Sequence, residues 1–317
     1  MTVDSRAPAS RTSLQLFTVF AALLLAAGLM ACQSGSDAGE EGHEDADGPP
    51  VVEVTARDYA FQAPDSIPSG WVTLQMENRG TEHHHFHLYR LPDGRTHEDF
   101  REGHLAPADS ARALFKAGER KRALKFLQTS VPDWARLGNL TIRGGMGAVA
   151  PDATGRVSAR LAPGRYVLVC LIPTPVGVPH FAHGMIGGLT ATEASSGAGP
   201  PEADLTMRAS GRELAVEGEF ETGENTVRFV VDSIPDVPDS TRTAWLARLD
   251  STTSAEDLAN WVVKANTTPP PAPFVGGFEY YPARDPIYFT VDLEPGRHAI
   301  LWGYRGGTPE PREFTVE

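Results

Sequence analysis

The sequence contains an internal repeat, which restricts the chain to folds built from two similar units. Residues 144–170, GGMGAVAPDATGRVSARLAPGRYVLVC, align without a gap with residues 276–302, GGFEYYPARDPIYFTVDLEPGRHAILW, at a separation of 132 residues. Upstream, LYRL at 88–91 and LARL at 246–249 are separated by 158 residues, so the first copy contains an insertion of 26 residues. For a chain of 317 residues, two domains of about 150 residues each are the expectation.

Both copies have the residue pattern of an all-β fold. Short runs rich in β-branched and aromatic residues, such as VVEVTA, WVTLQMEN and RYVLVCL, are bounded by Pro, Gly and Asn, and the chain contains 31 glycines and 26 prolines. This pattern is typical of β-sandwiches. An acidic helical turn follows the middle strand of each copy, at 95–103 and at 253–262. The sequence therefore predicts two tandem Greek-key β-sandwiches, the first with a short helical insertion.

The insertion in the first copy has a helical pattern. ADSARALFKAGERKRALKFLQ, residues 108–128, is predicted as one helix with Asp109 or Ser110 as its N-cap. Its basic residues are expected to form a solvated helix face rather than a docking site. The predicted boundaries are a first sandwich at 51–193, a linker at 194–202 and a second sandwich at 203–317.

The N-terminus carries a targeting segment. Arginines precede the uncharged apolar run LQLFTVFAALLLAAGLMA, which ends next to Cys32 and is followed at once by small and acidic residues. This arrangement resembles a bacterial lipoprotein signal, with an uncleaved anchor helix as the alternative. The resemblance implies that residues 1–31 are a signal peptide, that Cys32 carries lipid, and that residues 32–50 form a disordered tether. The folded part is then expected outside the cytoplasm on a membrane, with Gln33 favouring the outer membrane if the cell has one.

The net charge restricts the class of partner. The formal net charge is −13, and nucleic-acid binding depends on Lys and Arg side chains that neutralise phosphates. We therefore expect no nucleic acid among the partners. The expected contacts are with other proteins and, through the lipid on Cys32, with a membrane.

Cys170 is the residue whose chemistry most needs an explanation. It ends the apolar run GRYVLVC, and it has no disulfide partner if Cys32, the only other cysteine, carries lipid. A free thiol in an oxidising compartment is expected to be buried or bound to a metal. His180 and Met185 follow on the adjoining loop, and His84 lies in ENRGTEHHHFH on an earlier predicted strand. Thiolate, thioether and imidazole together favour copper, although Cys and His also suit zinc.

The order of these residues resembles the cupredoxin, or blue copper, family. Asn78 lies six positions before His84 at a strand start, Cys170 ends a later strand, and His180 lies five positions before Met185. The resemblance implies one type 1 copper site, with His84, Cys170, His180 and Met185 as its ligands. Nine residues separate Cys170 from His180, an interval longer than in small electron carriers and closer to that of copper nitrite reductases.

Four further residues are expected around this site. Asn78 and Phe86 are expected to support the ligands, and Phe86 would help to exclude water from the metal. His85 and His183 are the alternative ligands. His183 fits the family spacing poorly, because only one residue separates it from Met185.

The histidine run at 83–87 leaves two interpretations open. Side chains alternate along a strand, so His83, His85 and His87 point away from the core if His84 and Phe86 point into it. Three histidines on one face could hold a second metal ion. A solvated surface is the favoured interpretation, because no carboxylate pattern nearby in the sequence completes a site.

The second copy lacks the ligands of the first. Trp302 stands at the position of Cys170, and Arg242 stands at the position of His84. We therefore expect the second sandwich to be a cupredoxin-like unit without a metal of its own, which serves as a spacer or docking module.

The favoured function is that of a one-electron carrier that exchanges electrons with redox partner proteins. The alternatives are a lipoprotein that buffers copper or delivers it to copper-handling proteins, and an interaction module without metal. We expect no enzymatic activity of the nitrite reductase kind, because it needs a second, all-histidine copper site. The second copy offers only His298 for such a site.

Overall fold

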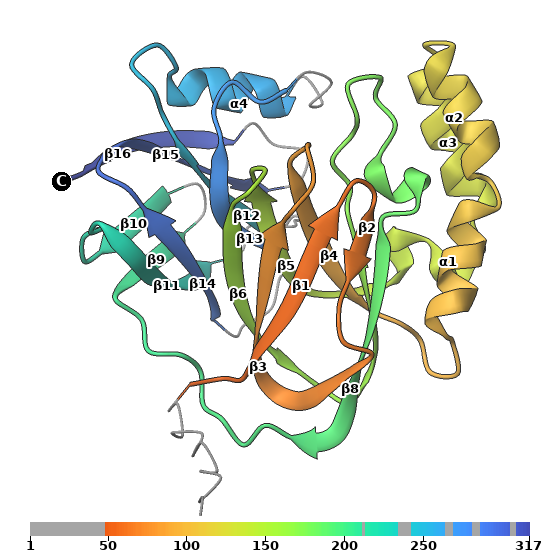
Figure 1. The fold of residues 1–317 in the computed structure, drawn as a ribbon, viewed down its shortest axis with the longest axis horizontal. Coiled ribbons are helices and arrows are strands. Elements are labelled where there is room, and N and C mark those ends of the chain that lie inside the picture. Colours follow the sequence, from red (N-terminus) through yellow and green to blue (C-terminus); the bar gives the residue numbers. More distant parts are fainter. Residues whose placement is uncertain (1–47, 211–212, 234–241, 264–268, 281–285, 305–308) are drawn as a thin grey trace, which may run out of the picture. The chain divides into compact units, whose positions relative to one another are not determined.

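The computed structural model describes residues 48–210, 213–233, 242–263, 269–280, 286–304 and 309–317. Residues 45–317 belong to one unit, which is mostly β-structure (Figure 1). The predicted signal peptide, Cys32 and nearly all of the predicted tether lie outside the described residues. None of the helices that the structure describes is long and apolar enough to cross a membrane.

The predicted all-β fold class is confirmed, and the strands fall into two lobes. The first lobe, residues 48–195, contains β1 (Val51–Arg57), β2 (Ala60–Gln62), β3 (Ser66–Asn78), β4 (His84–Arg90), β5 (Thr141–Val149), β6 (Thr154–Leu161), β7 (Gly164–Val169) and β8 (Ile186–Ser195). The second lobe, residues 203–317, contains β9 (Leu205–Ser210), β10 (Glu213–Glu217), β11 (Gly223–Ser233), β12 (Arg242–Arg248), β13 (Phe274–Tyr280), β14 (Ile287–Leu293), β15 (Gly296–Tyr304) and β16 (Glu310–Val316). Residues 196–202 of the predicted linker lie in the connection between β8 and β9, whereas residues 194 and 195 still belong to β8.

The sequence repeat corresponds to repeated structure. β4 and β12 start 158 residues apart, at His84 and Arg242, and β7 and β15 start 132 residues apart, at Gly164 and Gly296. Both acidic turns form the helices expected of them, α1 (His97–Leu105) and α4 (Ala255–Val263). α1 begins with a capping box in which Thr96 and Asp99 bond each other's backbone N–H groups.

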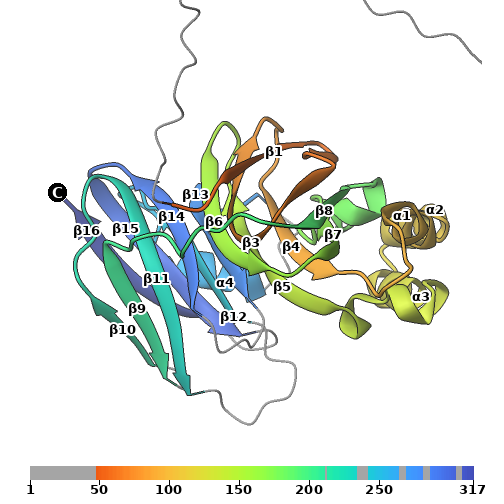
Figure 2. The same cartoon turned by 90° about the horizontal axis from the view of Figure 1, so that it is seen from below.

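The insertion differs from its prediction. It forms two α-helices, α2 (Ala108–Lys116) and α3 (Arg120–Ser130), followed by short 3-10 helices at Asp133–Ala135 and Leu137–Asn139. The prediction of one continuous helix is wrong because Gly118 adopts a left-handed φ of 76°, a conformation that ends helices. The N-cap prediction is also wrong, since α2 starts directly after Pro107. Figure 2 shows that these helices cover the first lobe on the side away from the second lobe.

The two lobes share both of their sheets. One sheet pairs β6 with β14, and the other pairs β5 with β13, in each case antiparallel. Val157 lies opposite Phe289 in the first pair, and Met146 lies opposite Phe278 in the second. In both pairs the two residues are 132 positions apart, so each is the repeat equivalent of the other. Equivalent strands that pair antiparallel at equivalent positions are the geometry of a twofold axis, here within one chain.

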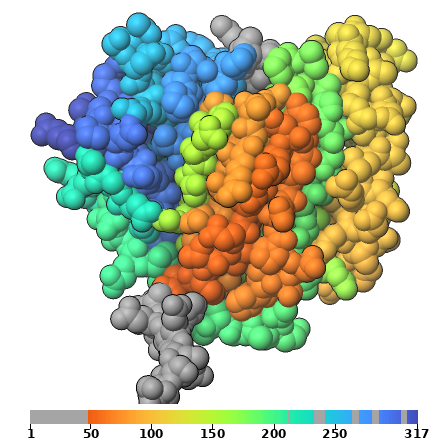
Figure 3. Space-filling view, viewed as in Figure 1, coloured from red at the N-terminus to blue at the C-terminus, as the bar shows by residue number. Residues whose placement is uncertain are grey.

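The main hydrophobic core is continuous through both lobes. It contains Phe86, Met146 and Val157 of the first lobe together with Phe278 and Phe289 of the second. A smaller core lies under the inserted helices. In the space-filling view, β1, β2 and β3 form the surface between the second lobe and those helices (Figure 3). The division into separately folding domains stays a prediction.

Candidate metal centre

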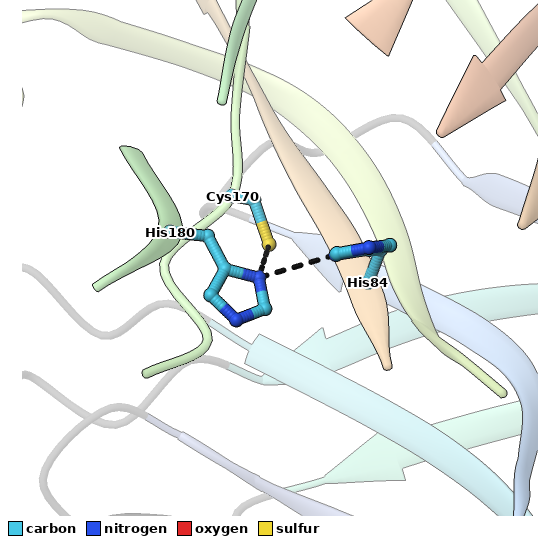
Figure 4. Close-up of side chains that lie close together, drawn as sticks. All are labelled: His84, Cys170 and His180. Carbon is cyan, nitrogen blue, oxygen red and sulfur yellow. Dashed lines mark hydrogen bonds between the residues drawn. The ribbon is translucent and has the colours of Figure 1, made fainter. Parts of the chain in front are cut away.

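Three elements of the first lobe bring one sulfur and two imidazoles together. His84 starts β4, Cys170 follows the last residue of β7, and His180 starts a 3-10 helix, His180–His183, in the loop before β8. All three side chains are fully buried. Figure 4 shows the two histidines and the cysteine pointing toward one another. Among the described residues, this group is one of two whose donor atoms are close enough to share a metal ion.

The loop after Cys170 is held by its own backbone. The N–H of His180 donates to the carbonyl of Ile172 at 2.9 Å, and the N–H of Phe181 donates to the carbonyl of Cys170 at 3.0 Å. Met185 accepts from the N–H of Cys170 at 3.3 Å and donates to the carbonyl of His180 at 3.2 Å. These bonds fix the backbone positions of Cys170, His180 and Met185 relative to one another, and the Met185 side chain is fully buried.

The donor atoms face one another at distances suited to a shared ion. The Nδ1 atoms of His84 and His180 are 3.1 Å apart, and the Sγ of Cys170 lies 3.4 Å from Nδ1 of His180. The opposite ring nitrogens contact carboxylates. Nε2 of His84 lies 2.7 Å from Asp58 Oδ1, and Nε2 of His180 lies 2.8 Å from Glu82 Oε2.

These carboxylates decide where the ring protons lie. A carboxylate accepts a hydrogen bond, so each neutral imidazole carries its proton on Nε2 and presents a lone pair at Nδ1. Two lone pairs cannot form a hydrogen bond, although the Nδ1 atoms of His84 and His180 are within bonding distance. A cation between the two nitrogens resolves this conflict. Asp58 and Glu82 are themselves held, by Thr81 and by the hydroxyl of Tyr59 respectively.

Burial sets the protonation of the donors in the absence of metal. It lowers the pKa of His180 to about 3, so this ring stays neutral at ordinary pH. Burial also raises the pKa of the Cys170 thiol to about 12, against the opposite effect of the backbone N–H groups of His85 and Ile172. The sulfur is therefore a thiol unless a metal ion stabilises the thiolate. The donor set of one thiol and two neutral imidazoles fits a thiophilic transition metal.

The residues predicted around the site have distinct positions. Asn78 is the last residue of β3, and its amide donates to the carbonyls of Glu82 and Val149 at 2.9 Å each. Phe86 is fully buried in the core. His183 lies outside the group of Cys170 and stacks on Tyr59, with ring centroids 4.7 Å apart.

The prediction of a solvated face for the histidine run is wrong. His85 and His87 are only 4% and 8% exposed, and Trp245 and Glu279 of the second lobe lie against them. His83 is partly buried, and its Nε2 accepts from the N–H of Phe274 at 3.4 Å. Both His85 and His87 lie near Glu279 of β13.

The sequence analysis missed two residues that hold the imidazoles of His84 and His180. Asp58 and Glu82 are two of 41 acidic residues, and no spacing distinguishes them from the others. Gly80 offers a weak signal: a Cβ at this position would lie 2.7 Å from Nε2 of His84 and even closer to Asp58. The absence of a side chain at Gly80 allows Asp58 to reach the ring.

The second lobe fills the equivalent position with its own side chains. Arg242 and Trp302, the equivalents of His84 and Cys170, are both buried, and the guanidinium carbon of Arg242 lies 5.7 Å from the centre of the Trp302 ring. A fixed cation on an aromatic ring thus stands where the first lobe has its donor atoms.

No family model matches the sequence, and no curated protein matches it. Among solved structures, the fold is similar to dithionite-reduced auracyanin from the photosynthetic bacterium Roseiflexus castenholzii, with 16% identity, 46% of this chain and 98% of that chain covered, and a TM-score of 0.27. An azurin from the methylotroph Methylomonas sp. strain J matches with 17% identity, coverage of 45% and 98%, and a TM-score of 0.25. A multicopper oxidase matches with 12% identity, coverage of 84% and 88%, and a TM-score of 0.23. At such low similarity, the assignment of the site rests on its own geometry.

Proposed function

We propose that the first lobe holds one type 1 copper ion and carries single electrons between redox partner proteins. The observation that supports this most directly is the opposed pair of Nδ1 atoms of His84 and His180, 3.1 Å apart, beside the sulfur of Cys170. Bound there, copper would supply a one-electron couple whose two oxidation states both accept sulfur and imidazole ligands. Met185 is the residue we assign as the weak axial ligand.

The construction of the site favours electron transfer over copper delivery. The ligand loop is fixed by backbone bonds around Cys170, and the carboxylates of Asp58 and Glu82 hold both imidazoles from behind. A site held in one geometry reorganises little when its charge changes. The three donor side chains are also fully buried, which opposes exchange of the ion with a recipient protein.

The same burial argues against an enzyme. A catalytic metal needs a position that is open to substrate or water. His84, Cys170 and His180 have no exposed surface through which a substrate could approach. We therefore propose that the protein transfers electrons and does not convert a substrate.

An absorption spectrum tests the proposal. The purified chain, loaded with Cu²⁺, is expected to show an intense visible band from the Cys170 thiolate and a reversible one-electron response in voltammetry. Colourless protein that gives up its copper readily to a chelator would contradict the carrier and support the copper-handling alternative. Copper-free protein after loading would leave only an interaction module.

Membrane anchoring through Cys32 is a separate part of the proposal. It is supported by the apolar run before Cys32 and the polar segment after it. Cells that express the wild-type chain are expected to retain it in the membrane fraction, and Cys32→Ala is expected to release it. If the wild type and Cys32→Ala divide equally between the membrane and soluble fractions, the lipid anchor is contradicted. The copper proposal would not be affected.

A further inference from the structure

A second group of donor atoms lies where the two lobes meet. His85 and His87 of β4 face Glu279 of β13, which belongs to the second lobe. All three residues are more than nine-tenths buried. His85 and His87 alternate with Phe86 along β4, so they lie on the face of this strand opposite to Phe86.

The distances in this group suit ligands that share an ion. Nδ1 of His85 lies 3.4 Å from Glu279 Oε1, and Nε2 of His87 lies 3.4 Å from Glu279 Oε2. Both contacts are longer than the usual 2.7–3.2 Å range of N–H···O hydrogen bonds, roughly 2.9 Å at the mode. The two contacts end on different oxygens of Glu279, and one donor atom of each of the three residues lies within 4.8 Å of the other two, a separation that one ion can bridge.

One buried nitrogen of the group lacks a hydrogen-bond partner in the described part of the chain. Nδ1 of His85 is buried and has no hydrogen-bond partner among the described atoms. A buried ring nitrogen without a partner is costly, and the cost disappears if the atom is a metal ligand. The ring cannot easily turn away, because its Nε2 accepts from the backbone N–H of Leu171 at 2.9 Å.

The other two ligands are oriented by their neighbours. The indole N–H of Trp245 donates to Glu279 Oε1 at 2.9 Å. The hydroxyl of Tyr89 lies 3.4 Å from Nδ1 of His87, on the side of that ring away from Glu279. Partners of this kind, which fix a ligand from behind, are typical of metal sites.

We infer that His85, His87 and Glu279 bind a divalent transition-metal ion, Cu²⁺ or Zn²⁺, at the junction of the lobes. Both ions accept imidazole and carboxylate ligands and lie at the strong end of the divalent series. The hydrogen bond from Leu171 to Nε2 leaves the ring proton of metal-free His85 on Nδ1. The incoming ion takes the place of this proton, which passes to solvent. The imidazolate and the Glu279 carboxylate then balance the two positive charges of the ion.

The internal twofold relates this group to an equivalent set of residues, with which it can be compared. The equivalents of His85, His87 and Glu279 are Thr243, Trp245 and Gly147, which offer no comparable set of ligands. Of the two positions related by the internal twofold, only the one at His85, His87 and Glu279 therefore has such a group. The second lobe, which has no counterpart of the copper ligands, supplies the carboxylate that completes the group.

Zinc retention tests the inference independently of the copper site. The full chain with Cys170→Ser, which lacks the sulfur ligand, is mixed with Zn²⁺, desalted and analysed for zinc. About one zinc per chain is expected, since three protein ligands suffice to hold the ion. His87→Gln and Glu279→Gln in the same background are expected to weaken zinc binding at least tenfold. Zinc uptake in weakly buffered solution is expected to release a proton.

His83→Gln is the matched control, because His83 lies in the same run and touches the second lobe without joining the group. Circular dichroism checks that each variant is folded, and His87→Gln decides the question if Glu279→Gln does not fold. Competition between Cu²⁺ and Zn²⁺ then identifies the preferred ion. Absence of retained zinc, or equal retention in all variants, would overturn the inference. The visible band of the copper-loaded wild type is scored separately, so the two proposals can fail independently.

Discussion

The imidazoles of His84 and His180 face each other through Nδ1 at 3.1 Å, and each is held from behind by a carboxylate. The two carboxylates come from the segments before β2 and β4, which are distant in sequence from the ligand loop. The orientation of the two proposed ligands thus depends on Asp58 and Glu82, which lie outside the donor group. This relationship can be tested separately from the ligands themselves.

Asp58→Asn is expected to weaken copper binding by roughly 10- to 100-fold, the usual effect of losing a partner behind a metal ligand. The substitution removes the negative charge that makes His84 a stronger donor, so the reduction potential is expected to rise. Competition with a chelator measures the affinity, and voltammetry measures the potential. Gly80→Ala, whose Cβ would displace Asp58 from the ring, is expected to act in the same direction. Unchanged affinity in both variants would exclude this role for Asp58.

The two loop histidines are expected to behave differently. His180→Ala should abolish the visible band, whereas His183→Ala should leave it largely intact, because His183 stacks on Tyr59 outside the donor group. Absorption spectra of the copper-loaded variants make this comparison. The reverse result would exchange the roles of the two residues.

Met185 and Cys170 can be separated in the same way. Met185→Leu is expected to retain copper and the visible band but to raise the reduction potential, because the weak axial ligand tunes this potential. Cys170→Ser is expected to remove the band and most of the copper affinity. A Met185→Leu protein with an unchanged potential would show that Met185 serves only as part of the core.

The approach of Cys170 to His180 could be expected from sequence because both residues lie in one short stretch of the chain. The role of these residues and of Met185 as ligands stays a prediction. Cys170, His180 and Met185 lie within one connection between strands, and His84 lies at a strand start marked by Asn78. The fold class was also predictable, because strand patterns and turns are local properties. The break at Gly118 was missed, since a single glycine is compatible with a helix unless its φ is known.

The junction between the lobes could not be predicted from local patterns. His85 and His87 occupy alternate positions of β4, the pattern of a strand with one exposed face. They are nevertheless buried, and Trp245 and Glu279 of the second lobe lie against them. Glu279 lies 192 positions after His87, in the copy that has Arg242 and Trp302 in place of His84 and Cys170. Sequence spacing contains no information about which edges of the two sandwiches meet.

The free energy of unfolding of the metal-free protein is expected to be greatest near neutral pH and to fall toward both acidic and alkaline pH. Burial lowers the pKa of His85 and His180 to about 3, from an ordinary value near 6.5. Between these values the unfolded chain binds more protons than the folded chain, so stability falls as the pH falls below about 6.5. The slope reaches about 1.4 kcal/mol per pH unit for each histidine.

On the alkaline side, burial raises the pKa of Cys170 to about 12 from a usual 9.0. The unfolded thiol ionises first, so stability is expected to fall as the pH rises through this interval. Urea unfolding of the metal-free chain between pH 4 and 11 measures both limbs. His180→Gln should reduce the acid slope, and an unchanged midpoint from pH 6.5 to 4 would contradict the argument.

The internal twofold predicts what the first lobe does alone. In the full chain, β5 and β6 pair with their repeat equivalents, and Val157 lies opposite Phe289. A chain ending at residue 202 would expose both strand edges, and exposed edges pair with other chains. Because equivalent positions already face each other, two copies of the first lobe can reproduce the same pairing. We expect a symmetric dimer, measured by light scattering after circular dichroism has confirmed folding. A monomer at all concentrations would show that the pairing depends on the side chains of the second lobe.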